Sequence, residues 1–494
     1  MKIAFDPKSI DSYRKFLQVK QLPAFSIRGR VADVPDEYAS RITGKQKKLK
    51  HGEPDIPEWM FDYQADITRL AIRRQKFAVF ADCGLGKTAI LLCYARHVFN
   101  LIGSKKRVLI ITPPMVVRQM IGEAERFFPE TKFEIVRAAN LQEWLDSPGD
   151  AIGITNYEAL KDETKQGRLG ALILDEASIL KSHYGKYGQV CINIGKGLDW
   201  KLTATGTPAP NDRIEYANQA IFLDRFPTIN SFLAKFFINR GETSERWVLK
   251  NHALKPFYRS LSDWSIFLTD PSVYGWKDNC KTLPPINVHI HDVPLTASQE
   301  QWVREYTGNL VATRAGGIKT RGAYGQVSKG HWKGQRFETN KPEFIRNLIS
   351  QWRDSESTLL WCLYDEEQNG VHELIGGESL DGSTPIEKRI EAVDRFKAGE
   401  SKVLISKPQI LGFGLNLQIA TRQVFSGLQD SYEKYYQCVK RSNRIGSTKP
   451  LNVHIPVTEL EVPMVETVLR KAGRVEQDTK EQEQLFKEAC GSFS

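Results

Sequence analysis

Short apolar runs alternate with segments of helical periodicity along most of this chain. In the first half, the runs that predict strands are 77–80, 107–111, 152–154, 171–174 and 201–203. The pattern restarts after Pro284-Pro285, where the strand candidates are 286–290, 358–362, 402–406, 423–425 and 452–455. Strands that alternate with helices form βαβ units with parallel sheets. The sequence therefore predicts an α/β fold with two halves of comparable size.

The same pattern divides the chain into four segments. Residues 1–55 are polar, broken by Pro and Gly, and carry a basic cluster at 45–50, so we expect either a solvated arm or a contact with a nucleic-acid backbone. The two α/β halves occupy residues 56–285 and 286–460. Residues 461–494 form a charged, helical tail without a strand pattern.

Composition narrows the class of protein. A chain of 494 residues is too long for one core. A net charge of +10 and a pI near 9.0 favour a polyanionic partner. No apolar run approaches the roughly 18 residues of a membrane span, and the N-terminus lacks the apolar core of a signal peptide. The seven cysteines are scattered without a C-x₂-C pair, which fits a reducing cytoplasm and argues against a disulfide framework or a structural zinc.

Residues 81–88, with the sequence ADCGLGKT, have the build of a nucleotide phosphate loop. They lie between the strand candidate 77–80 and a helical segment. Backbone N–H groups around Gly84 and Gly86 bind anionic oxygens in such loops. Lys87 would reach the β- and γ-phosphates, and the Thr88 hydroxyl would ligate Mg²⁺. The first glycine of the motif is replaced by Ala81, and an ordinary turn with an N-cap is the alternative.

An acidic pair, Asp175-Glu176, follows the apolar strand candidate 171–174. A wholly apolar strand is typical of a parallel sheet buried on both faces, and its carboxyl end opens toward the ligand crevice. Asp175 would hold the Mg²⁺ shell beside Thr88, and Glu176 would orient or deprotonate the attacking water. An acidic strand end that caps a helix is the alternative.

Two further segments suit the same chemistry. The small hydroxyl residues of 203–208 follow a strand, and they either pass a hydrogen-bond change between sites or make a plain turn. Arg441 and Arg444 are three residues apart, which on a helix places both guanidinium groups on one face. Such a pair suits the charge on a transferring phosphoryl group, although two surface arginines on a helix usually have no such role.

Together these segments resemble the motifs of helicase superfamily two, and most closely its Swi/Snf-type branch of double-strand translocases. The matches, in chain order, are Tyr63-Gln64 with P-Y-Q, 81–88 with D-E-x-G-L-G-K-T, 175–178 with D-E-x-H, 203–208 with L-T-G/A-T-P, 411–417 with G-G-x-G-x-N-L, and 437–446 with Q-x-x-x-R-x-x-R-I-G. The resemblance covers roughly residues 56–460 in the correct order.

The resemblance implies two tandem RecA-like lobes with ATP in the cleft between them and Mg²⁺ as the metal. Lobe one would supply a glutamine that reads the adenine edge, the phosphate loop and the acidic pair, and lobe two would supply a glycine and two arginine fingers. These residues are Gln64, Gly84, Gly86, Lys87, Thr88, Asp175, Glu176, Gly414, Arg441 and Arg444. The implied activity is that of a nucleic-acid-stimulated ATPase that moves along duplex DNA or separates its strands.

Three alternatives stay open. An RNA-directed helicase of the same superfamily has the same ATP site. A nucleic-acid-binding scaffold with an inactive ATPase would be expected to lose Lys87, Asp175 or Glu176, and all three are present. A P-loop kinase or a small-molecule ATPase would not need the second lobe with its paired arginines.

The chain departs from the family pattern at the residues expected to couple hydrolysis to nucleic acid. Ser178 replaces the usual histidine, Lys440 stands where Asp is common, and Leu411 replaces a glycine. Weaker resemblances at 111–114 with Gln119, at 155–158 and at 380–384 match elements that touch nucleic acid in the family, with a plain turn or an N-cap as the alternative for each.

Residues 313–341 combine seven basic side chains with three interleaved aromatics, Tyr324, Trp332 and Phe337. The segment is expected to be either a surface that follows phosphates and stacks on bases, or a solvated connector. Since no nuclease or zinc module is visible in the sequence, we expect a separate nuclease or a replication or recombination protein to act beside this motor, in a bacterial or phage-infected cytoplasm.

Overall fold

The computed structural model describes residues 1–44, 52–181, 185–209, 213–241, 247–277, 283–307, 318–352, 356–411, 415–428, 431–444 and 447–490. The chain folds as two compact units. Unit 1 contains Met1–Asn279 and Lys480–Ser494, and unit 2 contains Cys280–Thr479. The last residues therefore return to unit 1, which the sequence pattern did not indicate.

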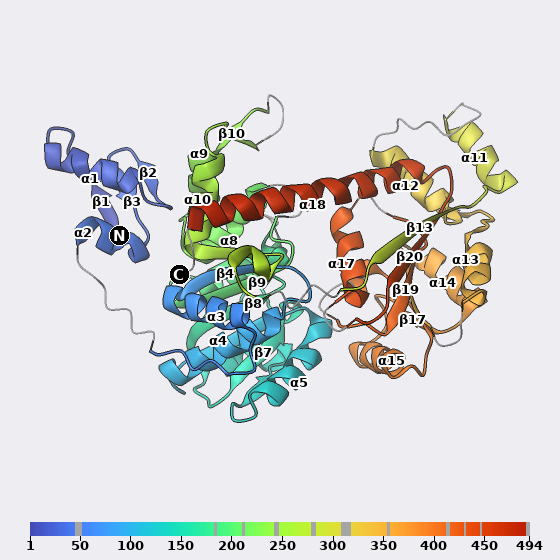
Figure 1. Ribbon diagram of the computed structural model, residues 1–494, viewed down its shortest axis with the longest axis horizontal. Coiled ribbons are helices and arrows are strands. Elements are labelled where there is room, and N and C mark those ends of the chain that lie inside the picture. Colours follow the sequence, from blue (N-terminus) through green and yellow to red (C-terminus); the bar gives the residue numbers. More distant parts are fainter. Residues whose placement is uncertain are drawn as a thin grey trace. The chain divides into compact units, whose positions relative to one another are not determined.

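Unit 1 is built on a seven-stranded sheet, ordered β12-β4-β9-β8-β5-β7-β6, in which every neighbouring pair is parallel (Figure 1). Its strands are β4 (Lys76–Ala81), β5 (Arg107–Thr112), β6 (Phe133–Ile135), β7 (Ile152–Asn156), β8 (Leu169–Asp175), β9 (Trp200–Thr205) and β12 (Ser265–Leu268). The five strands predicted for this half are confirmed, and β6 and β12 were not predicted.

Helices pack along this sheet because its central strands are apolar on both faces. Every residue of β8 is buried, which requires cover on both sides. The helices are α3 (Asp62–Arg74), α4 (Lys87–Ile102), α5 (Val117–Phe127), α6 (Leu141–Asp146), α7 (Lys186–Gly195), α8 (Tyr216–Phe222), α9 (Ile229–Phe236) and α10 (Leu254–Trp264). A two-stranded antiparallel hairpin, β10 (Phe237–Asn239) with β11 (Trp247–Leu249), follows α9.

Residues 1–44 are folded, which corrects the expectation of a solvated arm for that part of the chain. They form an antiparallel sheet, β1 (Lys2–Ala4), β3 (Val31–Asp33) and β2 (Ser26–Arg28), with helices α1 (Ile10–Lys20) and α2 (Ala39–Thr43). The buried Tyr38 donates a hydrogen bond to Asp263 of α10, and Lys235 of α9 donates to the carbonyl oxygen of Leu22 at 3.0 Å. These contacts fasten the N-terminal module to the rest of unit 1. The basic cluster 45–50 lies outside the described residues.

Unit 2 contains a second all-parallel sheet, of six strands ordered β13-β20-β19-β16-β18-β17. Its strands are β13 (Ile286–Asp292), β16 (Ser357–Trp361), β17 (Glu378–Leu380), β18 (Val403–Ser406), β19 (Ala420–Phe425) and β20 (Leu451–Val457). All five predicted strands are confirmed, and β17 was missed. The predicted α/β fold with parallel sheets is therefore confirmed in both units.

The helices of unit 2 follow the βαβ pattern of its sheet. They are α11 (Ala297–Thr307), α12 (Ile318–Val327), α13 (Lys341–Ser350), α14 (Asp365–Ile375), α15 (Ile386–Ala398), α16 (Pro408–Leu411), α17 (Tyr432–Ser442) and α18 (Val462–Cys490). Helix α18 corresponds to the predicted helical tail, and its residues from Lys480 onward belong to unit 1, where Glu483 accepts a hydrogen bond of 3.0 Å from the backbone N–H of Thr269.

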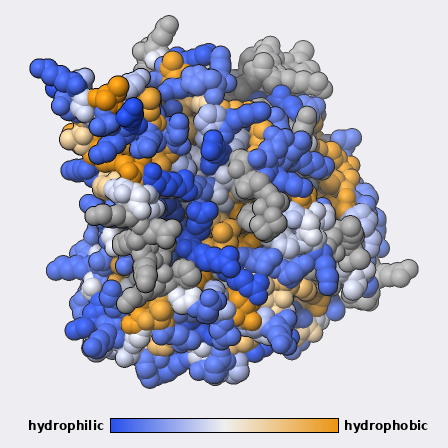
Figure 2. Space-filling model, turned by 60° about the vertical axis from the view of Figure 1, so that its left-hand side comes forward, coloured by the Kyte–Doolittle hydropathy of each residue, from blue (hydrophilic) through white to orange (hydrophobic). Residues whose placement is uncertain are grey.

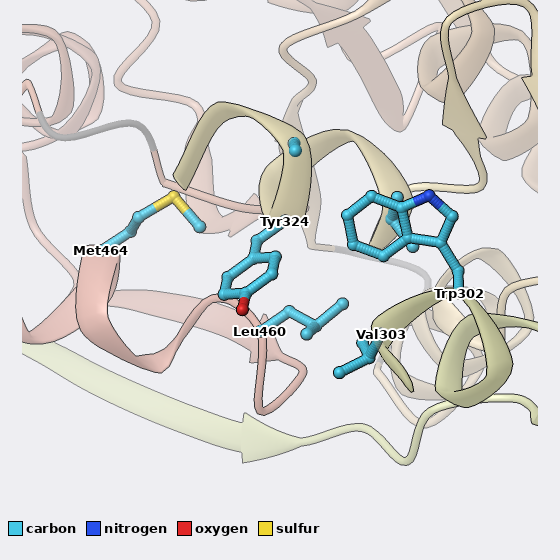
Figure 3. Packing of buried hydrophobic residues seen from close by; sticks show 7 residues of the cluster. Trp302, Val303, Tyr324, Leu460 and Met464 are labelled. Atoms are coloured by element: carbon cyan, nitrogen blue, oxygen red, sulfur yellow. The ribbon is translucent and has the colours of Figure 1, made fainter. Parts of the chain in front are cut away.

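The described part of the basic segment 313–341 is largely built into unit 2, so neither a solvated connector nor a wholly exposed basic surface describes it. Tyr324 is buried against Trp302 and Leu460, and Figure 3 shows Tyr324 and Leu460 lying between Met464 and Trp302. The remaining part forms a small antiparallel hairpin, β14 (His331–Trp332) with β15 (Gln335–Arg336). Residues 313–317 lie outside the described part of the chain.

Two lysines of that segment are buried as ion pairs. Lys329 and Lys341 both contact the carboxylate of Glu461, and all three side chains are almost completely buried. Burial opposes the charge on Glu461, but the two ammonium groups outweigh it and lower its pKa to about 2. These lysines therefore stabilise the core of unit 2 rather than contact a partner.

The surface is mostly hydrophilic on the face in Figure 2, with apolar side chains gathered in separate patches. Such patches are usual on folded proteins, because polar atoms cannot cover the whole surface. Of the described helices, none combines the length and the apolar character needed to cross a membrane.

Candidate nucleotide-binding site

The phosphate loop of unit 1 connects β4 to α4. Strand β4 ends at Ala81 and helix α4 begins at Lys87. The loop turns through Gly84 (φ 91°) and Gly86 (φ 68°), a left-handed backbone region that side chains with a Cβ adopt only with strain. The first N–H groups of α4 have no partner within the helix, so the loop and the helix N-terminus offer donors to an anion.

The side chain of Lys87 lies inside this loop. It is only 9% exposed, and its ammonium group donates hydrogen bonds to the carbonyl oxygens of Ala81 at 3.0 Å and Asp82 at 3.3 Å. Thr88 follows it in the first turn of α4. The ammonium group is thus held at the position where the loop would receive phosphate oxygens.

Helix α3 holds the loop from one side through Gln64. This side chain is buried, its amide nitrogen donates to the carbonyl oxygen of Leu85 at 3.2 Å, and its oxygen accepts from the N–H of Phe61 at 3.1 Å. The φ of Gly86 favours glycine, and a Cβ there would lie 2.2 Å from the amide nitrogen of Gln64 and would displace the end of that side chain. The recognition of adenine by Gln64 stays a prediction.

Asp175 ends β8, which lies between β9 and β5 in the sheet. It is 6% exposed, and one of its carboxylate oxygens accepts a hydrogen bond of 2.8 Å from the hydroxyl of Thr112. Burial and the neighbouring charge of Glu176 raise the pKa of Asp175 to about 7, against the lowering effects of the Thr112 hydrogen bond and of Lys87. A buried carboxyl group whose negative charge is not fully neutralised by its neighbours would suit a divalent cation beside the phosphate loop.

The backbone after Asp175 turns sharply. Glu176 has φ 47°, which is unusual for a residue with a side chain and stores strain of the kind found at active sites. The hydroxyl of Tyr157 donates to the carbonyl oxygen of Asp175 at 2.6 Å and supports this turn. Ser178, which replaces the family's histidine, is buried, and its hydroxyl lies 3.5 Å from the carbonyl oxygen of Glu176.

The third motif of unit 1 lies against the phosphate loop. Thr205 ends β9 and pairs in register with Phe80 of β4. A Cβ at Gly206 would lie 3.4 Å from the sulfur of Cys83, in ordinary contact with the loop. The hydroxyl of Thr205 accepts a hydrogen bond of 3.2 Å from the N–H of Thr207. A conformational change in the phosphate loop would therefore displace residues 203–208 directly.

In unit 2, Arg441 and Arg444 converge on one carbonyl oxygen. Arg441 is 2% exposed and donates to the carbonyl oxygens of Gln437 at 2.9 Å and Leu415 at 3.4 Å. Arg444 donates to the same oxygen of Leu415 at 3.1 Å. Helix α17 ends at Ser442, so the prediction that both arginines share a helical face is wrong for Arg444. Gly414 lies outside the described residues.

Three side chains that position this chemistry lie in segments that the sequence singled out, but the sequence did not predict this role for them. Thr112 and Tyr157 contact Asp175, and the hydroxyl of Tyr63 donates to the carbonyl oxygen of Leu85 at 3.1 Å. Thr112 is the last residue of β5 and Tyr157 directly follows β7, and both strands lie on the same side of β8 in the sheet order. Their place at parallel strand ends is the signal that could have assigned them to the acidic pair.

The weaker family elements adopt local turns. The side chain of Asn156 accepts a hydrogen bond of 3.0 Å from the N–H of Ala159, as an N-cap does. That of Asp381 accepts from the N–H groups of Ser383 and Thr384, each at 2.9 Å. Contact of these elements with nucleic acid stays a prediction.

Comparisons with known proteins agree with this arrangement of motifs. The model of the SNF2-related domain matches residues 63–329, and that of the helicase conserved C-terminal domain matches residues 340–446. Among curated proteins, the DNA annealing helicase and endonuclease ZRANB3 of Bos taurus is 26% identical over 80% of this chain and 38% of its own length. The SWI/SNF-related regulator of chromatin, subfamily A member 1, of Mus musculus is 24% identical over 76% of this chain and 39% of its own.

The chain thus spans about two fifths of the length of these two relatives. A solved structure, the SWI2/SNF2 ATPase core of Sulfolobus solfataricus in complex with double-stranded DNA, is similar at 17% identity with a TM-score of 0.41, covering 89% of this chain and 97% of that one. The SNF2-related model alone covers more than half of the 494 residues. The chain belongs to the SNF2-related domain family of superfamily two helicases.

Proposed function

We propose that this chain is an ATP-dependent DNA translocase, a nucleic-acid-stimulated ATPase that converts ATP hydrolysis into movement along duplex DNA. The observation that carries the proposal is the place of Lys87 and Asp175 at the carboxyl edge of the sheet of unit 1, close enough that the charge of Lys87 acts on the Asp175 carboxyl. Ligands of open parallel sheets bind at that edge.

The residues of unit 1 fit a nucleotide with its metal. Gly84 and Gly86 open the loop for phosphate oxygens, Lys87 offers an ammonium group, and Thr88 with Asp175 would hold Mg²⁺. Bound there, the metal would neutralise charge on the phosphates. Glu176, on its strained turn, is proposed to orient the attacking water and accept its proton.

The arginines of unit 2 are proposed to act on the same phosphates. Guanidinium groups stabilise the charge that spreads over a transferring phosphoryl group. Arg441 and Arg444 each donate a hydrogen bond to the carbonyl oxygen of Leu415, which belongs to the glycine-bearing element 411–417. We propose that Arg441 mainly positions this element and that Arg444, which is less buried, contacts the phosphates.

The proposed substrate is duplex DNA. The net charge of +10 suits a phosphate backbone, and contact through phosphates is independent of sequence and weakens with salt. One relative is named a DNA annealing helicase, and the Sulfolobus solfataricus protein is described in complex with double-stranded DNA. Both support DNA over RNA for this chain.

The test is a steady-state ATPase assay with Mg²⁺ on matched lengths of duplex DNA, single-stranded DNA and duplex RNA, alongside a strand-displacement assay. We expect the strongest stimulation from duplex DNA. Strongest stimulation by RNA would favour an RNA-directed helicase instead. No turnover under any condition would leave only a nucleic-acid-binding scaffold.

A further inference from the structure

The hairpin β14–β15 of unit 2 displays cations beside an exposed aromatic ring. Lys333, Gln335 and Arg336 are exposed, and Tyr306 of α11 is 44% exposed. In the described part of the chain, no carboxylate forms an ion pair with Lys333 or Arg336. The surface is thus small, positively charged and aromatic, whereas Lys329 and Lys341 at the base of the same segment are buried with Glu461.

The aromatic side chains there are arranged as an open stack. The ring of Tyr306 lies parallel to that of Trp302, with centroids 4.5 Å apart and an interplanar angle of 13°. Trp332 meets both rings edge-on, at 6.0 and 6.2 Å. Trp302 is buried in the core cluster shown in Figure 3, so the stack is anchored at one end. Tyr306 is the exposed end.

The hairpin is held rigidly at its base. The N–H of Phe337 donates to the carbonyl oxygen of Gly330 at 2.8 Å, and Thr339 donates through its hydroxyl to that of Ser328 at 2.9 Å. The buried Gln299 donates to the carbonyl oxygen of Val327 at 2.8 Å. The cations at the tip are therefore displayed from a fixed platform.

The tip carries a lysine where the backbone favours other residues. The two turn residues between the strands are Lys333 (φ 46°) and Gly334 (φ 81°), a two-residue turn with positive φ at both positions. Asn, Asp or Gly is preferred at the first of these positions. Lysine fits it poorly, and places that break a local rule are often functional. Its ammonium group lies 5.1 Å from the ring centroid of Trp332.

We propose that this hairpin with Tyr306 binds single-stranded DNA, with Lys333 and Arg336 on the phosphates and the ring of Tyr306 stacked on an unpaired base. A base offers a stacking face only where the strands are apart, so the surface would hold a single-stranded flank of the duplex. The inference rests on the proposed function and adds that the translocase binds unpaired DNA as well as duplex DNA.

The test compares binding of the full chain to a labelled blunt duplex and to the same duplex with a single-stranded oligo(dT) overhang. Tyr306→Leu keeps apolar contact with Trp302 but removes the ring, and Tyr306→Phe keeps the ring. The double variant Lys333→Asn with Arg336→Gln removes two positive charges. Asparagine is a preferred residue at the first position of this turn, so the hairpin should keep its fold. Lys388→Gln, an exposed lysine on α15, is the control for loss of one surface charge.

We expect Tyr306→Leu and the double variant each to weaken overhang binding at least about fivefold, the lower end of the contribution of one stacked base. Tyr306→Phe and Lys388→Gln should bind the overhang like the wild type, and ATPase activity without DNA should be the same in all variants. The preference of the wild type for the overhang over the blunt duplex should disappear in Tyr306→Leu.

Two results would overturn the inference. One is wild-type overhang binding by both test variants, as expected if the hairpin served a protein partner. The other is an equal loss on blunt and overhang DNA in the double variant with no effect of Tyr306→Leu, which would mean a backbone contact only. If DNA fails to stimulate the wild-type ATPase, it is the proposed function that fails, so the two failures are distinguishable.

Discussion

The ammonium group of Lys87 donates a hydrogen bond of 3.0 Å to the carbonyl oxygen of Ala81, the last residue of strand β4. The lysine thus bridges the two ends of the phosphate loop from within. Ala81 stands where the motif has its first glycine, and it serves here as an acceptor through its backbone alone. The departure in sequence therefore leaves the loop intact.

Replacement of this lysine should separate hydrolysis from DNA binding. We expect Lys87→Ala to reduce ATP turnover to background while the affinity for duplex DNA stays within about twofold, since the Lys87 side chain is only 9% exposed and offers little charge to a phosphate backbone. Lys105→Ala, an exposed lysine just beyond the other end of α4, should change neither quantity. ATP turnover by Lys87→Ala at the wild-type rate would contradict the assignment of Lys87 to the phosphates of ATP.

The two arginines of unit 2 should differ in what their loss does. Arg444→Ala is expected to lower kcat at least ~100-fold, because an arginine at a transferring phosphoryl group contributes factors of that size or more. ATP binding and the melting temperature should change little. An unchanged kcat would show that Arg444 only supports the backbone.

Arg441→Ala should lower both kcat and stability. This side chain is 2% exposed and its hydrogen bonds to the carbonyl oxygens of Gln437 and Leu415 would be lost. We expect about 2–4 kcal/mol of destabilisation, measured by urea unfolding, since hydrogen bonds to charged groups contribute about 1.5–3 kcal/mol each. A wild-type unfolding midpoint would contradict the positioning role.

Asp175 should make stability depend on pH. Its pKa is raised to about 7 in the folded chain, above its value near 4 when unfolded, so the folded state binds the extra proton. The contribution of Asp175 to the free energy of unfolding is fully present at low pH and is lost as the pH rises from about 4 to about 7. Asp175→Asn, which keeps an acceptor for Thr112, should melt a few degrees above the wild type at pH 8 in the absence of Mg²⁺ and nucleotide. That gain should shrink toward pH 5, and a constant difference across this range would be inconsistent with a raised pKa.

The buried lysines of unit 2 should be sensitive to the loss of the carboxylate that pairs with them. Glu461→Gln leaves Lys329 and Lys341 buried without it and is expected to cost about 3–5 kcal/mol by urea unfolding. Glu378→Gln, which breaks an exposed pair with Arg395, should leave the midpoint nearly unchanged. Equal effects of the two substitutions would show that burial does not set the strength of this ion pair.

Hydrophobic pattern predicted strands such as β8 because they are apolar on both faces. It missed β12, which follows α10 without a break, and β17, which has only three residues. Short strands owe their conformation to pairing with a neighbour, as β12 does with β4, and that neighbour is distant in the sequence. Local patterns do not contain that information.

The site was predicted where a motif is continuous and missed where partners come from different strands. Lys87 and Thr88 share one loop, so spacing located them. Thr112 reaches Asp175 only because β5 and β8 are neighbours in the sheet. In the same way, Glu461, the carboxylate that pairs with Lys329, lies 132 residues further along the chain. The basic segment 313–341 therefore resembled a binding surface in sequence, although part of it is buried in the core of unit 2.

DNA is expected to drive ATP hydrolysis at the loop that holds Lys87. The most direct measurement is the Mg²⁺-dependent ATPase rate of the wild type and of Lys87→Ala, each titrated with blunt duplex DNA at low and moderate salt. A rate that rises with duplex DNA in the wild type, weakens with salt and is absent in Lys87→Ala is the predicted result. A wild-type rate that does not respond to duplex DNA, or a DNA-stimulated rate that survives in Lys87→Ala, would contradict it.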